Sequence, residues 1–161
     1  MSNDSLNKLL AWKEAKSLTL LGYRNILPDI PSEEKWGIGI QLRRASQSIS
    51  TNIAEGFGRY YYQDMVRFCY IARGSLEETI SLVALSYGLG FIRDEKSQLL
   101  IEKSNQVLQL INGYISYLKK SILELKTIQT ILSTLSGKNI LKTILNPILN
   151  SQISILPMIN K

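Results

Sequence analysis

The 161-residue chain contains no histidine, which removes the side chain that most often serves as a general base or a metal ligand. A di-iron helical bundle needs Glu-x-x-His pairs, and this chain cannot supply them. The single cysteine, Cys69, excludes an intrachain disulfide and a zinc site built from thiolates. We therefore expect no catalytic residue, no metal site and no cofactor, and we interpret the protein as a non-enzyme.

Long apolar runs are also missing, since none approaches the ~18 residues that a membrane span requires. The first residues, MSNDSLNKLLAWKEAK, lack the basic-then-apolar layout of a signal peptide. An apolar content of 45% and a charged content of 20% are typical of a soluble globular protein. These features predict a cytoplasmic protein without a membrane partner.

Negative charge is in short supply, because the 19 Lys and Arg residues outnumber the 13 Asp and Glu residues and leave a net charge of +6. Residues 128–161 hold Lys138, Lys142 and Lys161 with no acid, so half of the excess lies in this part of the chain. A basic protein attracts polyanions, which makes RNA or DNA a candidate partner.

Apolar residues recur at helical spacing over four segments, at about residues 6–27, 33–56, 63–89 and 94–127. Pro28 and Pro31 end the first segment, and Ser32 is placed to cap the second. Gly56 and Gly58 are expected to end the second segment by adopting the left-handed conformation. The pattern predicts an all-α, up-and-down four-helix bundle of residues 1–127. Residues 128–161 are interpreted as a basic C-terminal extension, loosely attached or partly ordered.

The segment RRASQSISTNIAEGFGRYYY, residues 43–62, suggests a phosphate loop, a serine active site or a packed helix-to-helix corner. Its Gly-x-Gly follows a helix instead of a strand and no Gly-Lys-Ser/Thr occurs, so we interpret it as an interhelical turn. Ser48 lies among small residues, which favours packing over nucleophilic chemistry. Asn52 lies inside the core-facing arc, so we expect its amide to bond a backbone carbonyl or a side chain of the third helix and to fix the register.

Five arginines lie along the second and third segments and form the candidate nucleic-acid surface: Arg43, Arg44, Arg59, Arg67 and Arg73. The helical phase puts the first two outside the core arc, where they either contact a ligand or a second subunit or form a solvated face. Glu55 can reach Arg59 only if helical geometry continues past Gly56. The three tyrosines at 60–62 either stack on unpaired bases or pack at the end of the bundle.

The strings LLAWKEA, QLRRASQSISTNIAEGFGR and FCYIARGSLEETISLVALSYGLGFI resemble a four-helix bundle family over roughly residues 9–120. This is the family of proteins encoded in intervening sequences of bacterial large-subunit ribosomal RNA genes. The accessory variability protein of diversity-generating retroelements is similar at a greater distance. The resemblance implies a ring-like homopentamer with a basic surface, in which Asn52, Glu55, Gly56, Gly74 and Ser75 are structural positions. Glycine followed by serine in mid-helix indicates that another helix crosses closely there.

Two functions follow from these observations. The leading hypothesis is a non-catalytic, nucleic-acid-binding homo-oligomer associated with RNA or the ribosome, in which the five arginines contact phosphates and RNA is favoured over DNA. The alternative is a protein-interaction scaffold that docks a polymerase, such as a reverse transcriptase, or a ribosomal partner.

Overall fold

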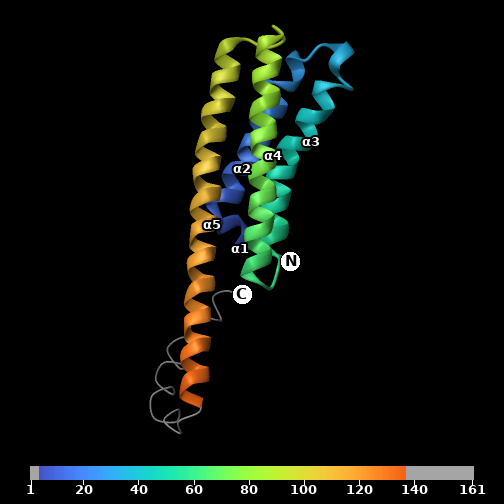
Figure 1. Ribbon diagram of the computed structural model, residues 1–161. Helices are drawn as coiled ribbons and strands as arrows, with labels where there is room; N and C mark the ends of the chain where they lie inside the picture. The colour runs from blue at the N-terminus through green and yellow to red at the C-terminus, as the bar shows by residue number, and fades with distance from the viewer. Residues whose placement is uncertain (1–3, 137–161) are drawn as a thin grey trace. The chain divides into compact units, whose positions relative to one another are not determined.

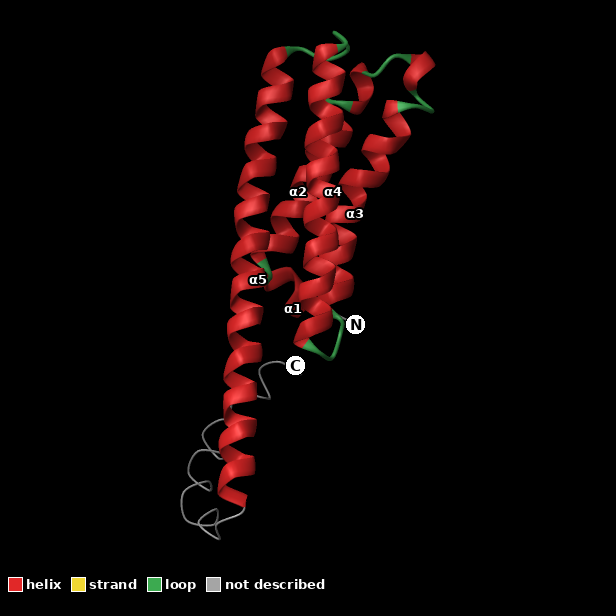
Figure 2. Cartoon of the chain, viewed as in Figure 1, coloured by secondary structure: helices red, strands yellow, loops and turns green. Residues whose placement is uncertain are grey.

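The computed structural model describes residues 4–136, and this part of the chain is helical with short connections and no strand (Figures 1 and 2). The all-α prediction is confirmed. The helices are α1 (Asp4–Lys8), α2 (Leu10–Asn25), α3 (Ile38–Phe57), α4 (Tyr62–Gly88) and α5 (Asp94–Ser136), with short 3₁₀ turns at Leu27–Asp29 and Ser32–Glu34.

The chain divides into two compact units, Met1–Lys119 and Lys120–Lys161, and α5 contributes residues to both. The first unit is the helical bundle. In the second unit, α5 continues to Ser136, so the predicted end of the fourth helix at residue 127 is wrong. Residues 128–136 contain neither glycine nor proline, and the first helix-breaking residue is Gly137. The predicted loose extension at 128–161 stays a prediction, because residues 137–161 lie outside the described part.

The predicted first helix is two helices, because Leu9 interrupts it with an extended backbone (φ −75°, ψ 105°). The N–H of Leu9 donates to the carbonyl of Leu6 at 3.0 Å and closes α1. At the other end, α2 stops at Asn25, and the chain continues into the 3₁₀ turn that contains Pro28. The prediction of one continuous helix over 6–27 is therefore wrong.

The second predicted helix begins at Ile38 instead of residue 33. Gly37, with φ −90° and ψ −107°, lies outside the helical region and separates α3 from the 3₁₀ turn before it. The carboxylate of Glu34 accepts the N–H of Ile38 at 3.3 Å. The cap predicted for Ser32 is thus wrong, since Glu34 supplies the side-chain oxygen at this end.

The predicted apolar stripes form the core of the first unit and are almost fully buried at Leu18, Leu42, Ile49, Ile53, Leu76, Val83, Leu100, Val107, Ile111 and Leu118. Leu27, in the 3₁₀ turn after α2, is also buried. Within the described residues, the apolar segment 80–92 leaves Leu85 49% and Leu89 51% exposed.

Small polar residues form the seam between α3 and its neighbours. The hydroxyl of Thr19 on α2 donates to the carbonyl of Ser46 at 2.7 Å, and the hydroxyls of Ser48 and Ser75 lie 2.8 Å apart across α3 and α4. The amide of Asn52 donates to the carbonyl and hydroxyl of Ser48 at 2.7 and 2.9 Å. Asn52 therefore bonds within its own helix, and Ser48 makes the link to α4.

The turn between α3 and α4 depends on Gly56 for its close packing and not for an unusual backbone. A Cβ at Gly56 would lie 2.8 Å from the Cβ of Phe68 and 3.3 Å from the carbonyl oxygen of Met65. Gly58, the C-cap residue, has φ −78°. Gly90 is the residue with positive φ among residues 4–136, so the predicted left-handed glycines at 56 and 58 are wrong.

Candidate nucleic-acid interface

The arginine pair on α3 splits between two directions, since successive helical side chains point about 100° apart. Arg43 is partly buried and folds back over Gly39, with its guanidinium 3.9 Å from the position of a Cβ on that glycine. Arg44 is exposed and has no partner among residues 4–136. Arg43 and Arg44 are therefore not placed to contact the same phosphate together.

Arg59 lies in the turn between α3 and α4 and has partners within its own chain. It forms an ion pair with Glu55 one helical turn away, and its guanidinium lies 4.8 Å from the ring centroid of Phe68. The sequence allowed this pair only if helical geometry continues past Gly56. It does, because α3 extends to Phe57. A nearby carboxylate offsets the charge of Arg59 and weakens its attraction for a phosphate.

Arg67 is exposed on α4 and makes no ion pair or hydrogen bond within the described part of the chain. The Ser48–Ser75 contact fixes the level of α3 against α4. Arg67 lies eight residues before Ser75, and Arg44 four residues before Ser48 on the antiparallel helix. At about 1.5 Å per residue these two arginines stand roughly 18 Å apart along the axis. They are separate charges, not one patch.

Arg73 belongs to a cluster of charged and aromatic side chains on the edge between α4 and α5, which we call the Tyr70 cluster: Tyr70, Arg73, Asn112 and Lys119. The guanidinium of Arg73 lies 4.9 Å from the ring centroid of Tyr70, and the ammonium of Lys119 lies 5.4 Å from the same centroid. Arg73 also donates to the amide oxygen of Asn112 at 3.3 Å. Asn112 is neutral, so it offsets neither of the two positive charges.

Sequence reasoning found Arg73 but missed Lys119 and Asn112. The two cations are 46 positions apart in the chain, and only the packing of α5 on α4 brings them to one ring. Lys119 sits in a stretch of the fourth predicted helix that also contains Lys120 and Lys126. Nothing in the sequence distinguishes the one lysine that faces Tyr70.

Two of the three turn tyrosines are exposed. Tyr60 is 89% exposed and Tyr61 is 65% exposed, and their rings meet edge to face with centroids 5.0 Å apart. Tyr62 is partly buried at the start of α4. Packing at the bundle end therefore accounts for Tyr62 but leaves Tyr60 and Tyr61 open to a ligand or another chain.

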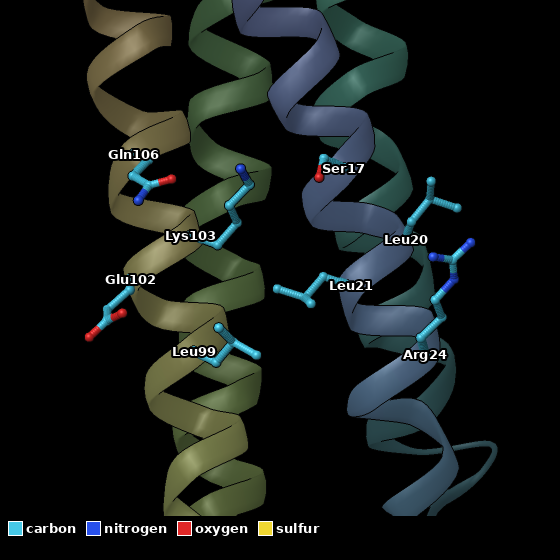
Figure 3. Close-up of a pocket in the computed structure, with 8 residues that line it drawn as sticks. All are labelled: Ser17, Leu20, Leu21, Arg24, Leu99, Glu102, Lys103 and Gln106. Carbon is cyan, nitrogen blue, oxygen red and sulfur yellow. The ribbon is translucent and has the colours of Figure 1, made fainter.

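A pocket of about 330 Å³ lies between α2 and α5 of the first unit (Figure 3). In the close-up, Leu21 points toward α5, whereas Arg24 points away from it. Lys103 on the pocket wall pairs with Glu14 on α2, and Ser17 on the α2 side has no histidine to activate it.

The perturbed titratable groups are buried packing residues. Burial raises the pKa of the Cys69 thiol to about 11. Burial, followed by the nearby Cys69, Tyr117 and Tyr62, raises the pKa of Tyr114 to about 12. No group of three potential metal ligands occurs in the described residues, and none of the helices described there is long and apolar enough to cross a membrane. In both groups burial is the largest cause of the pKa shift.

Comparisons with known proteins identify the family. A solved structure of a protein of unknown function from the S23 ribosomal protein family of Bacteroides thetaiotaomicron is similar, with a TM-score of 0.62 and 18% identity. The similarity covers 66% of this chain and 96% of that one, and at this identity it shows the fold alone. No curated protein matches the chain. Residues 7–113 match the family described as 23S rRNA-intervening sequence protein, so the chain belongs to this family.

Proposed function

We propose that the protein is a non-catalytic RNA-binding homo-oligomer of the cytoplasm, and that the Tyr70 cluster is its principal contact with RNA. The observation that carries this proposal is the meeting of Arg73 and Lys119 on one exposed tyrosine ring, with no carboxylate among residues 4–136 paired to either cation. The family's name refers to 23S rRNA, which favours RNA over DNA as the polyanion.

The chemistry of the Tyr70 cluster suits a nucleic-acid strand. Arg73 and Lys119 both lie within about 6 Å of the Tyr70 ring, so they can contact neighbouring phosphates without large rearrangement. The planar guanidinium and the ring also offer surfaces on which an unpaired base can stack. Contacts of this kind carry little sequence specificity, since every base has a stacking face.

The other predicted arginines support the proposal less. Arg43 is folded back and Arg59 is paired with Glu55, so neither is available without rearrangement. Arg44 is exposed on α3, and its contribution to binding stays a prediction that Arg44→Ala can test. Arg67 is exposed on α4 about 120° around the helix axis from Arg73, so it does not join Arg73 on the ring of Tyr70.

Self-association is the second part of the proposal. The resemblance implies a ring of five copies, and exposed apolar side chains such as Leu85 and Leu89 give independent support for association. A ring would repeat the Tyr70 cluster in every subunit and multiply the net charge of +6. Repeated sites on one RNA raise the overall affinity through high effective concentration.

The test compares the double variant R73Q/K119Q with the matched control K13Q/R24Q, which removes the same charge from exposed positions on α2. Both are titrated against a fluorescent single-stranded RNA at several KCl concentrations. R73Q/K119Q should bind more weakly, with the salt slope reduced by about one for each phosphate that the variant no longer neutralises. The control should keep a slope close to that of the parent. Parental affinity and slope in R73Q/K119Q would remove the Tyr70 cluster from the site.

A further inference from the structure

The part of α5 that lies in the second unit carries apolar side chains along one side. Four of them recur at intervals of three or four residues and lie within about 120° around the helix axis. We call these four residues the α5 stripe: Ile122, Leu125, Ile128 and Leu132. Leu125 is 48% exposed, and Ile131, which borders the stripe, is 51% exposed. An apolar side of a helix is stable in water when another apolar surface covers it.

The opposite side of the same helix is polar, and its hydroxyls bond within the helix. Thr127, Thr130 and Thr134 each donate to the carbonyl one turn earlier, at 3.0, 2.9 and 2.9 Å. Leu123 lies among these threonines as a single leucine and is 66% exposed. Over residues 120–134, the α5 stripe is therefore the continuous apolar surface.

Residues 137–161 follow α5 directly and lie outside the described part of the chain. Their sequence begins with a second apolar run, in which six residues have helical spacing: Ile140, Leu141, Ile144, Leu145, Ile148 and Leu149. Gly137, Lys138 and Asn139 stand between the two apolar runs. A link of this length is typical of an αα-hairpin, whose two helices are joined by two to five residues.

We propose that residues 140–149 fold back as a second helix and cover the α5 stripe. Folding back after residue 139 places this segment beside Ile128 and Leu132. Pro147 kinks such a helix and leaves residues 140–146 as its regular part. Residues 150–161 are long enough to continue along Leu125 and Ile122, because even as a helix they span about 18 Å. The chain beyond α5 can therefore cover the whole stripe.

Connectivity favours the chain's own tail as the partner of the α5 stripe. The three-residue link holds the tail beside the stripe at an effective concentration of about millimolar, whereas a second copy is present only at its bulk concentration. Each chain closes its own hairpin, so the contact is compatible with any number of copies. The inference concerns the second unit and depends neither on RNA binding nor on self-association.

The test determines which side of α5 the tail meets, with pairs of cysteines in the full chain on a Cys69→Ala background. L132C/I144C links the α5 stripe to the proposed second helix. T134C/I144C is the matched control, because position 134 lies on the polar side and is closer in sequence to residue 144. Each protein is checked for parental helicity by circular dichroism, treated with a short bismaleimide and weighed by denaturing mass spectrometry. We expect L132C/I144C to form a bridge within one chain at least about tenfold faster than the control.

Hydrogen exchange in the chain with its natural stripe gives a second measurement. The amides of residues 140–146 should exchange more slowly than those of a free peptide with the same sequence, since helical hydrogen bonds protect them. L132Q places a polar side chain in the α5 stripe and should speed this exchange about tenfold. L123Q makes the same change on the polar side and should leave the exchange as it is in the parent.

Three results would overturn the proposal. Equal bridging rates in the two cysteine pairs would mean that the tail has no preferred side of α5. Unprotected amides at residues 140–146 of the parent would mean that no second helix forms. A bridge between two chains, seen as a doubled mass, would assign the α5 stripe to a second copy. None of these results affects the RNA titration, so the proposed function is tested separately.

Discussion

Replacing Gly56 with alanine is expected to destabilise the bundle, although alanine is the better helix former. In mid-helix the change from glycine to alanine contributes about 1 kcal/mol of stability through helix propensity. At Gly56 the added Cβ would lie 2.8 Å from the Cβ of Phe68, an atom fixed to the α4 backbone. It would also lie 3.3 Å from the carbonyl oxygen of Met65, so α3 and α4 must move apart.

The size of the effect follows from these two short distances. Overpacking of this kind costs about 1–3 kcal/mol, which offsets and exceeds the propensity gain. We expect Gly56→Ala to lose about 1–2 kcal/mol in the free energy of unfolding. Gly113→Ala is the matched control, because a Cβ there meets nothing within 4 Å and only the propensity gain remains. The two variants should therefore shift stability in opposite directions.

Urea unfolding followed by circular dichroism at 222 nm measures both variants. For a chain of this size, a change of about 1–2 kcal/mol moves the midpoint by about 0.5–1 M at an m-value near ~2 kcal/mol/M. The Gly56→Ala midpoint should fall and the Gly113→Ala midpoint should rise. If Gly56→Ala is as stable as Gly113→Ala, the close approach of α3 and α4 at this turn is refuted.

Two further predictions concern the helix seam and the buried thiol. Ser48→Ala removes the contact with Ser75 and one of the two hydrogen bonds of Asn52. It should lower the free energy of unfolding, measured in urea, by about 1 kcal/mol. Ser50→Ala should lower it less, because the hydrogen bond from the Ser50 hydroxyl to the Gln47 carbonyl is long. The pKa of about 11 keeps Cys69 protonated in the folded chain while the unfolded thiol ionises near its ordinary value. The folded state then holds more protons above pH 9, so stability should fall as pH rises from about 9 to 11. The drop should be smaller in Cys69→Ala when urea midpoints at about pH 8 and pH 10 are compared.

Helical periodicity predicted which residues form the core, because burial depends on the 3.6-residue repeat and not on fine detail. Leu18, Ile49, Leu76 and Ile111 are buried as the pattern predicted. The helix ends were harder to predict. The start of α3 is set by the backbone of Gly37 and by the Glu34 carboxylate, and a serine in the cap position was a misleading signal.

The candidate site could be predicted only in part, for a geometric reason. Positive charge along a helix is visible in the sequence, but the partner of each charge depends on packing between helices. Arg59 is occupied by Glu55, a residue four positions away, and the sequence indicated this as a possibility. The meeting of Lys119 and Arg73 on Tyr70 depends on how α5 lies against α4, which no local pattern encodes.

The arginines of α4 show why a count of basic residues is a poor guide to function. Arg67 and Arg73 are six positions apart, which places them about 120° apart around the helix axis. Arg73 therefore lies on the α5 side with Asn112, and Arg67 lies on the outer face with Ile71 and Glu78. The two arginines of α4 therefore point in different directions, which a count of basic residues does not show.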